Sequence, residues 1–132
     1  MSRFADTSYF LALLIPNDEH HDSALRLTDG WRGNLVTTDF VLIEVANHLS
    51  PQTSRGVFQR FIAAVSQDPR MRVIPATRDL FRRGSDLYGA RLDKNWSLTD
   101  CISFEVMRDL RLVEALTGDH HFEQAGFTAL LT

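Results

Sequence analysis

Four carboxylates, three of them within or beside strongly apolar sequence, could together bind a hard metal ion. They are Asp6 in "RFADTSYFLALL", Glu44 in "FVLIEVA", Asp100 in "SLTDCISF" and Asp119 in "ALTGDHHF". A carboxylate in apolar surroundings is costly unless something compensates its charge, and converging carboxylates resist joint ionisation. Mg²⁺ or Mn²⁺, which take oxygen ligands, would relieve both costs. Because such an ion binds phosphate oxygens and lowers the pKa of a bound water, the implied chemistry is hydrolysis of a phosphodiester.

Each of these acids also has an ordinary structural explanation. Asp6 and Asp119 could each cap the helix that follows them. Asp100 stands three residues after Ser97, which is the spacing of a capping box. Glu44 has no capping role in a helix interior, although it could face solvent. The four acids taken together indicate a shared site more strongly than any one of them does.

The segments that would position the acids alternate between strand and helix patterns. We expect a first strand within 2–8, running directly into a helix, and further strands at 34–38, 71–76, 111–117 and 127–131. Apolar residues at helical spacing predict helices at 8–15, 19–31, 39–50, 54–67, 77–92, 97–110 and 119–125. Pro16 should stop the first helix, and Thr77 is an expected N-cap.

Strands that alternate with helices pair in parallel through right-handed crossovers. The sequence therefore predicts an α/β fold with three layers, α/β/α, around a mostly parallel five-stranded sheet, in one domain spanning 1–132. The site in such folds lies beyond the carboxyl ends of the strands. Asp6 ends the first expected strand and Asp119 follows the fourth, so the acids can converge if these strands are neighbours.

The composition excludes several classes of protein. A net charge of −3 over 132 residues argues against strong non-specific adhesion to nucleic acid or membranes, although a local patch could still bind RNA. The single cysteine, Cys101, excludes an intrachain disulfide and a cysteine zinc site, and it fits a reducing, cytoplasmic setting. No stretch approaches the roughly 20 apolar residues that cross a bilayer, and the N-terminus does not look like a signal peptide.

The four acid motifs, in this order, resemble the PIN-domain family and look closest to the VapC-type toxin ribonucleases. The resemblance covers the whole chain and is most distinctive in "SLTDCISF" and "HHFEQAGF". It implies a Mg²⁺- or Mn²⁺-dependent endoribonuclease whose acidic site is Asp6, Glu44, Asp100 and Asp119. It also implies an RNA substrate, a homodimer, and an antitoxin, usually encoded next door, whose peptide covers the site.

Several neighbours of the acids could contribute to such a site. Thr7, Ser8 and Asn47 could donate hydrogen bonds to the acids, or could act as local caps. Gly118 is expected to loosen the loop that carries Asp119, which makes Asp119 the least secure ligand. Within the charged segment 78–94, most residues fit a solvated helix face, and Arg91 is one of the two better candidates for contacting RNA phosphates.

The second RNA candidate, Lys94, stands close to Trp96, which could stack on a base but better fits a core or dimer position. Two histidine pairs, at 20–21 and 120–121, attract a metal interpretation. Neighbouring helical residues point about 100° apart, so such a pair rarely binds one ion. We expect His20 and His21 at the surface, and His121 or His120 at the border of the site.

Two other functions remain open from the sequence. A phosphoacceptor domain also gathers acids and Mg²⁺ at strand ends, but it needs a lysine beyond a late strand, and the chain's one lysine precedes the Asp100 helix. A PIN-like module could also bind RNA or a partner without cleaving. Intact acids at all four positions argue against this second alternative.

Overall fold

The sheet has five strands in the order β3-β2-β1-β4-β5, and every pair is parallel. A computed structural model describes residues 1–132. Its strands are β1 (Ser2–Ala5), β2 (Asn34–Thr38), β3 (Met71–Ile74), β4 (Glu114–Leu116) and β5 (Thr128–Ala129). Phe4 of β1 pairs with Val36 of β2 on one side and with Ala115 of β4 on the other. The expected adjacency of the first and fourth strands is therefore confirmed.

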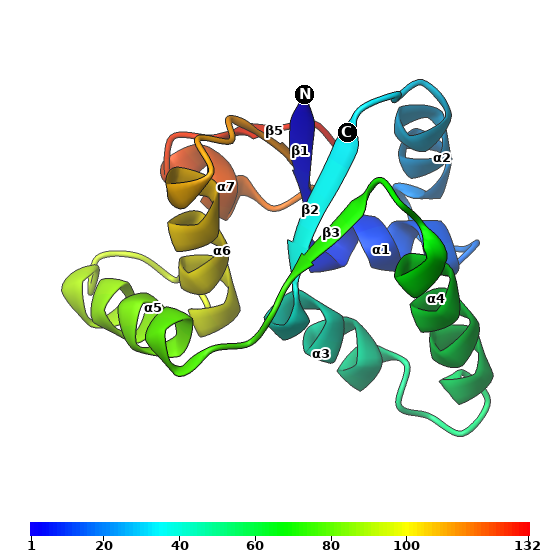
Figure 1. Ribbon diagram of the computed structural model, residues 1–132, viewed down its shortest axis with the longest axis horizontal. Coiled ribbons are helices and arrows are strands. Elements are labelled where there is room, and N and C mark those ends of the chain that lie inside the picture. Colours follow the sequence, from blue (N-terminus) through cyan, green and yellow to red (C-terminus); the bar gives the residue numbers. More distant parts are fainter.

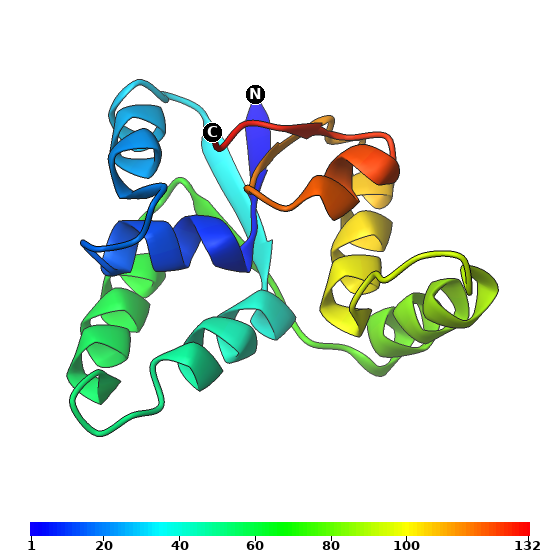
Figure 2. The same ribbon diagram turned by 180° about the vertical axis from the view of Figure 1, so that it is seen from behind.

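Seven helices flank the sheet: α1 (Thr7–Leu14), α2 (His21–Asp29), α3 (Asp39–His48), α4 (Arg55–Gln67), α5 (Arg78–Ala90), α6 (Leu98–Asp109) and α7 (His120–Gln124). Figures 1 and 2 show α1, α2 and α4 on one side of the strands and α5, α6 and α7 on the other, with α3 starting where β2 ends. This arrangement confirms the three-layer α/β/α fold. None of the helices has the length and apolar character needed to cross a membrane.

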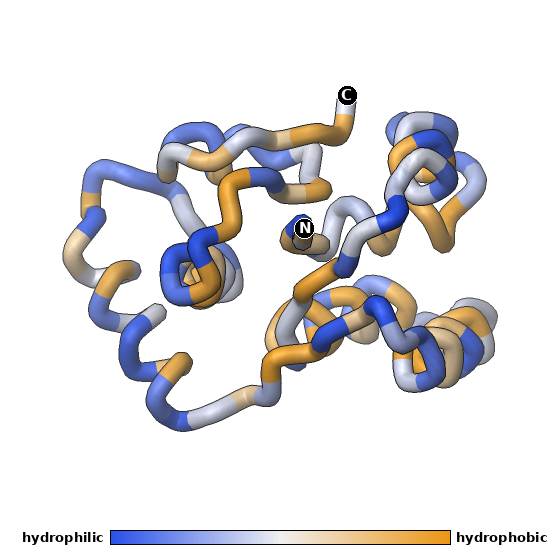
Figure 3. The backbone as a smooth tube through the Cα atoms, turned by 45° about the horizontal axis from the view of Figure 1, so that its top comes forward, coloured by the Kyte–Doolittle hydropathy of each residue, from blue (hydrophilic) through white to orange (hydrophobic).

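Local sequence signals set the helix boundaries next to the acids. Thr38 caps α3 by accepting the N–H of Val41, and Thr77 caps α5 by accepting the N–H of Leu80. Ser97 caps α6 within a capping box. In Figure 3 the outlying α5 is mostly hydrophilic, with apolar residues recurring along its length, as expected for a helix with one packed face.

An aromatic cluster fixes α6 and α7 relative to the sheet. Phe104 is fully buried and meets the rings of Trp96 and Phe122 edge to face, with centroids 5.0 and 4.9 Å apart. Phe122 in turn lies 6.3 Å from Phe4 of β1. Because aromatic side chains contribute large buried areas, this cluster holds α6 and the first turn of α7 against β1.

Candidate active site

All four acids line one open cleft at the carboxyl ends of the strands. Its volume is about 340 Å³, and it is lined by Asp6, Thr7, Ser8, Leu11, Glu44, His48, Asn95, Ser97, Asp100, Asp119 and His121. Asp6 and Asp119 follow β1 and β4, Glu44 comes from the interior of α3, and Asp100 comes from the first turn of α6. The acids lie up to 113 positions apart in the chain (residue 119 minus residue 6). The structure thus brings together the residues that the sequence singled out, while their role as metal ligands stays a prediction.

Asp6 forms the buried floor of the cleft. It is only 4% exposed, and it occupies the N-cap position of α1 without a capping hydrogen bond from its side chain. Its carboxylate instead accepts a hydrogen bond of 2.8 Å from the hydroxyl of Thr117, at the end of β4. The capping explanation of Asp6 is therefore wrong, because its side chain points across the sheet toward the neighbouring strand.

Burial controls the protonation of Asp6. The pKa of its carboxyl group is raised to about 7, chiefly by loss of hydration and to a smaller extent by the negative charges of Asp100 and Glu44. The hydrogen bond from Thr117 acts in the opposite direction. A carboxylate held in this way needs either a proton or a cation beside it.

Asp100 both caps a helix and faces the cleft. It accepts the N–H of Ser97 at 3.2 Å, while the Ser97 hydroxyl accepts the N–H of Asp100 at 3.0 Å. The same carboxylate oxygen, Oδ2, lies 3.0 Å from Nδ1 of His121. Burial raises the pKa of Asp100, and the hydrogen bond with His121 lowers it. The capping box is confirmed, and it does not compete with a role in the cleft.

Glu44 turns into the cleft from α3. Its carboxylate accepts a hydrogen bond from the hydroxyl of Thr7, which is buried in the first turn of α1. The preceding residue, Ile43, is 54% exposed and takes the solvent side of the helix. Glu44 is thus half-buried and held, and the solvent-facing alternative is wrong.

The loop that carries Asp119 is anchored at each residue. The N–H of Asp119 donates to the Thr117 hydroxyl, and the N–H of Gly118 donates to the Ser8 hydroxyl, at 3.0 and 3.2 Å. The ring of His20 packs over Gly118, so that an added Cβ there would lie 3.3 Å from His20 Nε2. The expectation of a loosened loop is wrong, because two hydroxyl groups and a ring hold it.

Asp119 caps α7, as its alternative explanation predicted. Its carboxylate accepts the N–H of His121 at 2.9 Å. The expected surface positions of His20 and His21 need correction, since both are half-buried and His21 Nδ1 lies 2.6 Å from the carbonyl oxygen of Ala12. His121 does border the cleft, as expected.

Two of the three predicted helper residues lie where they can act. Thr7 binds Glu44, and Ser8 binds the Asp119 loop. Asn47 does not reach the acids, because it is exposed near the end of α3 and lines a separate hollow with Leu49. Sequence reasoning missed Thr117, whose polar side chain at the end of an apolar strand was the available signal.

The donor set of the cleft fits a hard divalent cation. No lysine or arginine lines it, so nothing with a fixed positive charge balances the four carboxylates. Carboxylate oxygens are the ligands that Mg²⁺ and Mn²⁺ prefer. A bound ion would take the place of the proton that the raised pKa values of Asp6 and Asp100 favour.

A second, larger cleft continues from the acids along α5 and α6. It has a volume of about 750 Å³ and shares Asn95 and Ser97 with the acid cleft. Arg91 and Lys94 line it, and both lie close to Asp93, at 3.0 and 3.9 Å. This second cleft therefore places two cations beside the acid cleft.

Trp96 takes a structural position at the back of this second cleft. It is 4% exposed and donates its ring N–H to Gln124 at 2.9 Å. The core interpretation of Trp96 is correct, and its ring is covered too well to stack on a base. Cys101 is also fully buried, as expected.

Comparison with known proteins assigns the family. The model of the PIN domain matches residues 3–128. The chain belongs to the PIN-domain family. Among curated relatives, this PIN domain is 29% identical over 124 residues to the 23S rRNA-specific endonuclease VapC20 of Mycobacterium tuberculosis, in strains CDC 1551 and H37Rv, with 94% of each chain covered.

Solved structures agree with this assignment. The crystal structure of M. tuberculosis VapC20, described as a sarcin–ricin loop cleaving toxin, is similar with a TM-score of 0.89, 26% identity and full coverage of both chains. A toxin–antitoxin complex from Klebsiella pneumoniae has a TM-score of 0.62 at 19% identity, covering 89% of this PIN domain and 87% of that chain. FitAcB of Neisseria gonorrhoeae has a TM-score of 0.69 at 14% identity, covering 100% and 97%. The last two show the fold alone, and the resemblance to VapC-type toxin ribonucleases is confirmed by the family and by VapC20.

Proposed function

We propose that this PIN domain is a Mg²⁺- or Mn²⁺-dependent endoribonuclease that acts in the cytoplasm as the toxin of a toxin–antitoxin pair. The observation that carries this proposal is the convergence of Asp6, Glu44, Asp100 and Asp119 on one cleft without a lysine or arginine. Family membership and the likeness to VapC20 support the reaction type. These findings favour phosphodiester hydrolysis over the other chemistries of an acidic cleft.

Threonine and serine residues orient three of the four acids in such a site. Thr117 orients Asp6, Ser97 orients Asp100, and Thr7 orients Glu44 through the hydrogen bonds described above. A divalent ion bound by these acids supplies phosphate charge neutralisation and an activated water. The protein's own contribution is to hold the acids in place before the ion and the phosphate arrive.

The neighbouring cleft gives the substrate a path away from the acids. Arg91 and Lys94 lie where an RNA strand leaving the acid cleft past Asn95 would pass. Cationic side chains bind phosphates without reading sequence, so they would position the strand. VapC20 is named for cleavage of 23S rRNA, and ribosomal RNA is accordingly the first substrate to test.

A homodimer and a neighbouring antitoxin complete the proposal. One structural neighbour is described as a toxin–antitoxin complex, which supports a protein inhibitor for this fold. A small DNA-binding protein encoded beside this chain should copurify with it and suppress cleavage. Light scattering of the purified chain should give the mass of two copies.

The proposal is tested by cleavage of purified ribosomal RNA. Metal-stripped protein should be inactive, and Mg²⁺ or Mn²⁺ should restore cleavage. Asp6→Asn should abolish it, whereas the matched variant Asp86→Asn, which changes an exposed acid on α5, should cleave normally. Cleavage by highly purified Asp6→Asn protein would remove the acid cleft from the reaction, and a well-folded wild type that binds RNA but never cleaves would favour a binding module.

A phosphoacceptor role is not favoured by the structure. Its required lysine would have to follow a late strand, whereas Lys94 precedes α6 and lies 3.9 Å from Asp93. Lys94 lines the second cleft and does not line the acid cleft.

A further inference from the structure

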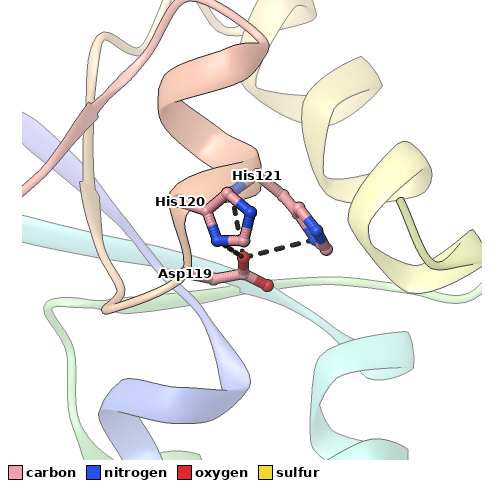
Figure 4. Close-up of side chains that lie close together, drawn as sticks. All are labelled: Asp119, His120 and His121. Carbon is pink, nitrogen blue, oxygen red and sulfur yellow. Dashed lines mark hydrogen bonds and ion pairs between the residues drawn. The ribbon is translucent and has the colours of Figure 1, made fainter. Parts of the chain in front are cut away.

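Both rings of the 120–121 histidine pair lie against the carboxylate of Asp119. Nδ1 of His121 is 3.2 Å from Asp119 Oδ1, and Nδ1 of His120 is 3.8 Å from the same oxygen. One donor atom from each residue lies within 4.8 Å of the other two. Figure 4 shows both rings next to the carboxylate of Asp119. Both rings lie close to the residue that caps their helix, although neighbouring helical side chains usually point apart.

These separations suit a bound transition ion. Zn²⁺ lies about 2.0–2.1 Å from each nitrogen or oxygen ligand, and tetrahedral coordination then places neighbouring ligands about 3.3–3.4 Å apart. The two donor atoms of Asp119 and His121 are already close to this spacing, at 3.2 Å. The side chain of His120 is 72% exposed, so it can close its remaining gap without disturbing the core.

Two of the three donors are held in place by other parts of the chain. The Asp119 carboxylate accepts the N–H of His121, and the His121 ring is fixed by Asp100 of α6, 3.0 Å away. His121 Nδ1 thus faces carboxylate oxygens from two different elements. Electron-rich atoms so close together require a proton or a cation among them.

We propose that Asp119, His120 and His121 form a second cation site, selective for divalent transition ions such as Zn²⁺ and Co²⁺ over Mg²⁺. Imidazole nitrogen suits these ions, whereas Mg²⁺ binds oxygen ligands. Asp119 also lines the acid cleft. When Asp119 binds an ion at the second site, its carboxylate is no longer available to the ion of the acid cleft, and cleavage is inhibited. This inhibition rests on the proposed function, but the binding site itself does not.

Calorimetry tests the site directly. Zn²⁺ titrated into protein that has been stripped of transition metals and is kept in millimolar Mg²⁺ should bind, and His120→Ala should weaken the Zn²⁺ affinity about tenfold or more. His48→Ala is the matched control, because His48 is an exposed histidine of the same cleft outside the three donors. Unchanged affinity in His120→Ala, or an equal loss in His48→Ala, would overturn the site. Circular dichroism checks that the exposed substitution leaves the fold intact.

A second arm separates this site from the proposed reaction. Asp6→Asn should keep the Zn²⁺ affinity of the wild type, since Asp6 is not one of the three donors. In the cleavage assay, inhibition of the His120→Ala protein should need about tenfold more Zn²⁺ than inhibition of the wild type. Zn²⁺ binding that depends on His120 in a protein without cleavage would refute only the ribonuclease. If the enzyme cleaves RNA but His120→Ala leaves its Zn²⁺ affinity unchanged, only this site is refuted.

Discussion

The hydroxyl of Thr7 donates a hydrogen bond to the carboxylate of Glu44, and this contact joins the first turn of α1 to the middle of α3. It fixes the one acid of the cleft that comes from a helix interior. The same principle recurs at Asp6, which Thr117 holds from the neighbouring strand. Hydroxyl donors therefore set the positions of acids that no arginine or lysine accompanies.

Thr7→Val should weaken Mn²⁺ binding about 10- to 100-fold, as losses of such supporting hydrogen bonds do at other metal sites. The free energy of unfolding should fall by only about 1 kcal/mol, because one half-buried hydrogen bond is lost. Mn²⁺ titration followed by electron paramagnetic resonance measures the affinity. Thr7→Ser keeps the hydroxyl and should restore binding, so equal losses in both variants would show that the hydrogen bond does not matter.

The metal-free protein should become less stable as the pH rises from 3.8 to about 7. Burial raises the pKa of Asp6 to about 7, so in this window the folded state binds a proton that the unfolded state has released. The free energy of unfolding should fall by roughly 2–4 kcal/mol across it. Urea unfolding in the presence of a chelator, at pH values on either side of the window, measures this change.

Asp6→Asn is the control for this pH dependence, because an amide carries no titrating proton. The variant should lose most of the decline and should be more stable than the metal-free wild type above the window. Divalent metal should stabilise the wild type there by binding the folded state. A variant with the full decline of the wild type would show that the effect arises elsewhere.

Removing the two cations of the second cleft should weaken RNA binding without changing its sequence preference. Arg91→Ala and Lys94→Ala should each reduce the slope of log affinity against log salt by about one, because each removes one phosphate contact. Each substitution is made in the Asp6→Asn protein, so that filter binding measures RNA affinity without cleavage. Arg82→Ala, an exposed arginine of α5 outside this cleft, is the control and should leave the slope unchanged.

Two glycines of α5 should respond in opposite directions to alanine. A Cβ at Gly84 would lie 2.3 Å from Ile102 Cγ1 of α6, whereas nothing lies within 4 Å of the corresponding position at Gly89. Gly84→Ala should lower the free energy of unfolding by about 1–3 kcal/mol through overpacking. Gly89→Ala should raise it by about 0.5–1 kcal/mol through helix propensity. Thermal unfolding of both variants checks the contrast, and a stabilised Gly84→Ala protein would contradict the close approach of α5 and α6.

Local signals explain how much of the fold could be predicted from the sequence. The alternation of strand and helix patterns gave the layers, and caps such as Thr77 and Ser97 marked where helices begin. The convergence of Asp6 and Asp119 followed from a general rule about the ends of parallel strands. These inferences needed only neighbouring residues and the geometry of the sheet.

The contacts that the sequence did not reveal join residues far apart in the chain. Thr117 reaches Asp6 across 111 positions, and His20 packs on Gly118 from the start of α2. Both depend on the register of β4 beside β1, which no local pattern specifies. Asn47 was misplaced because the sequence does not fix which face of α3 each residue takes: the next residue, His48, lines the acid cleft, whereas Asn47 lines a separate hollow.

The central claim is that the four acids form a binding site for a divalent cation in a single cleft. Anomalous X-ray scattering from crystals soaked in Mn²⁺ measures this directly, because it locates manganese without assumptions about chemistry. We predict an anomalous peak between the carboxylates of Asp6 and Asp100, absent from crystals of the Asp6→Asn protein. Full manganese occupancy elsewhere on the surface, with no peak at these acids, would contradict the account.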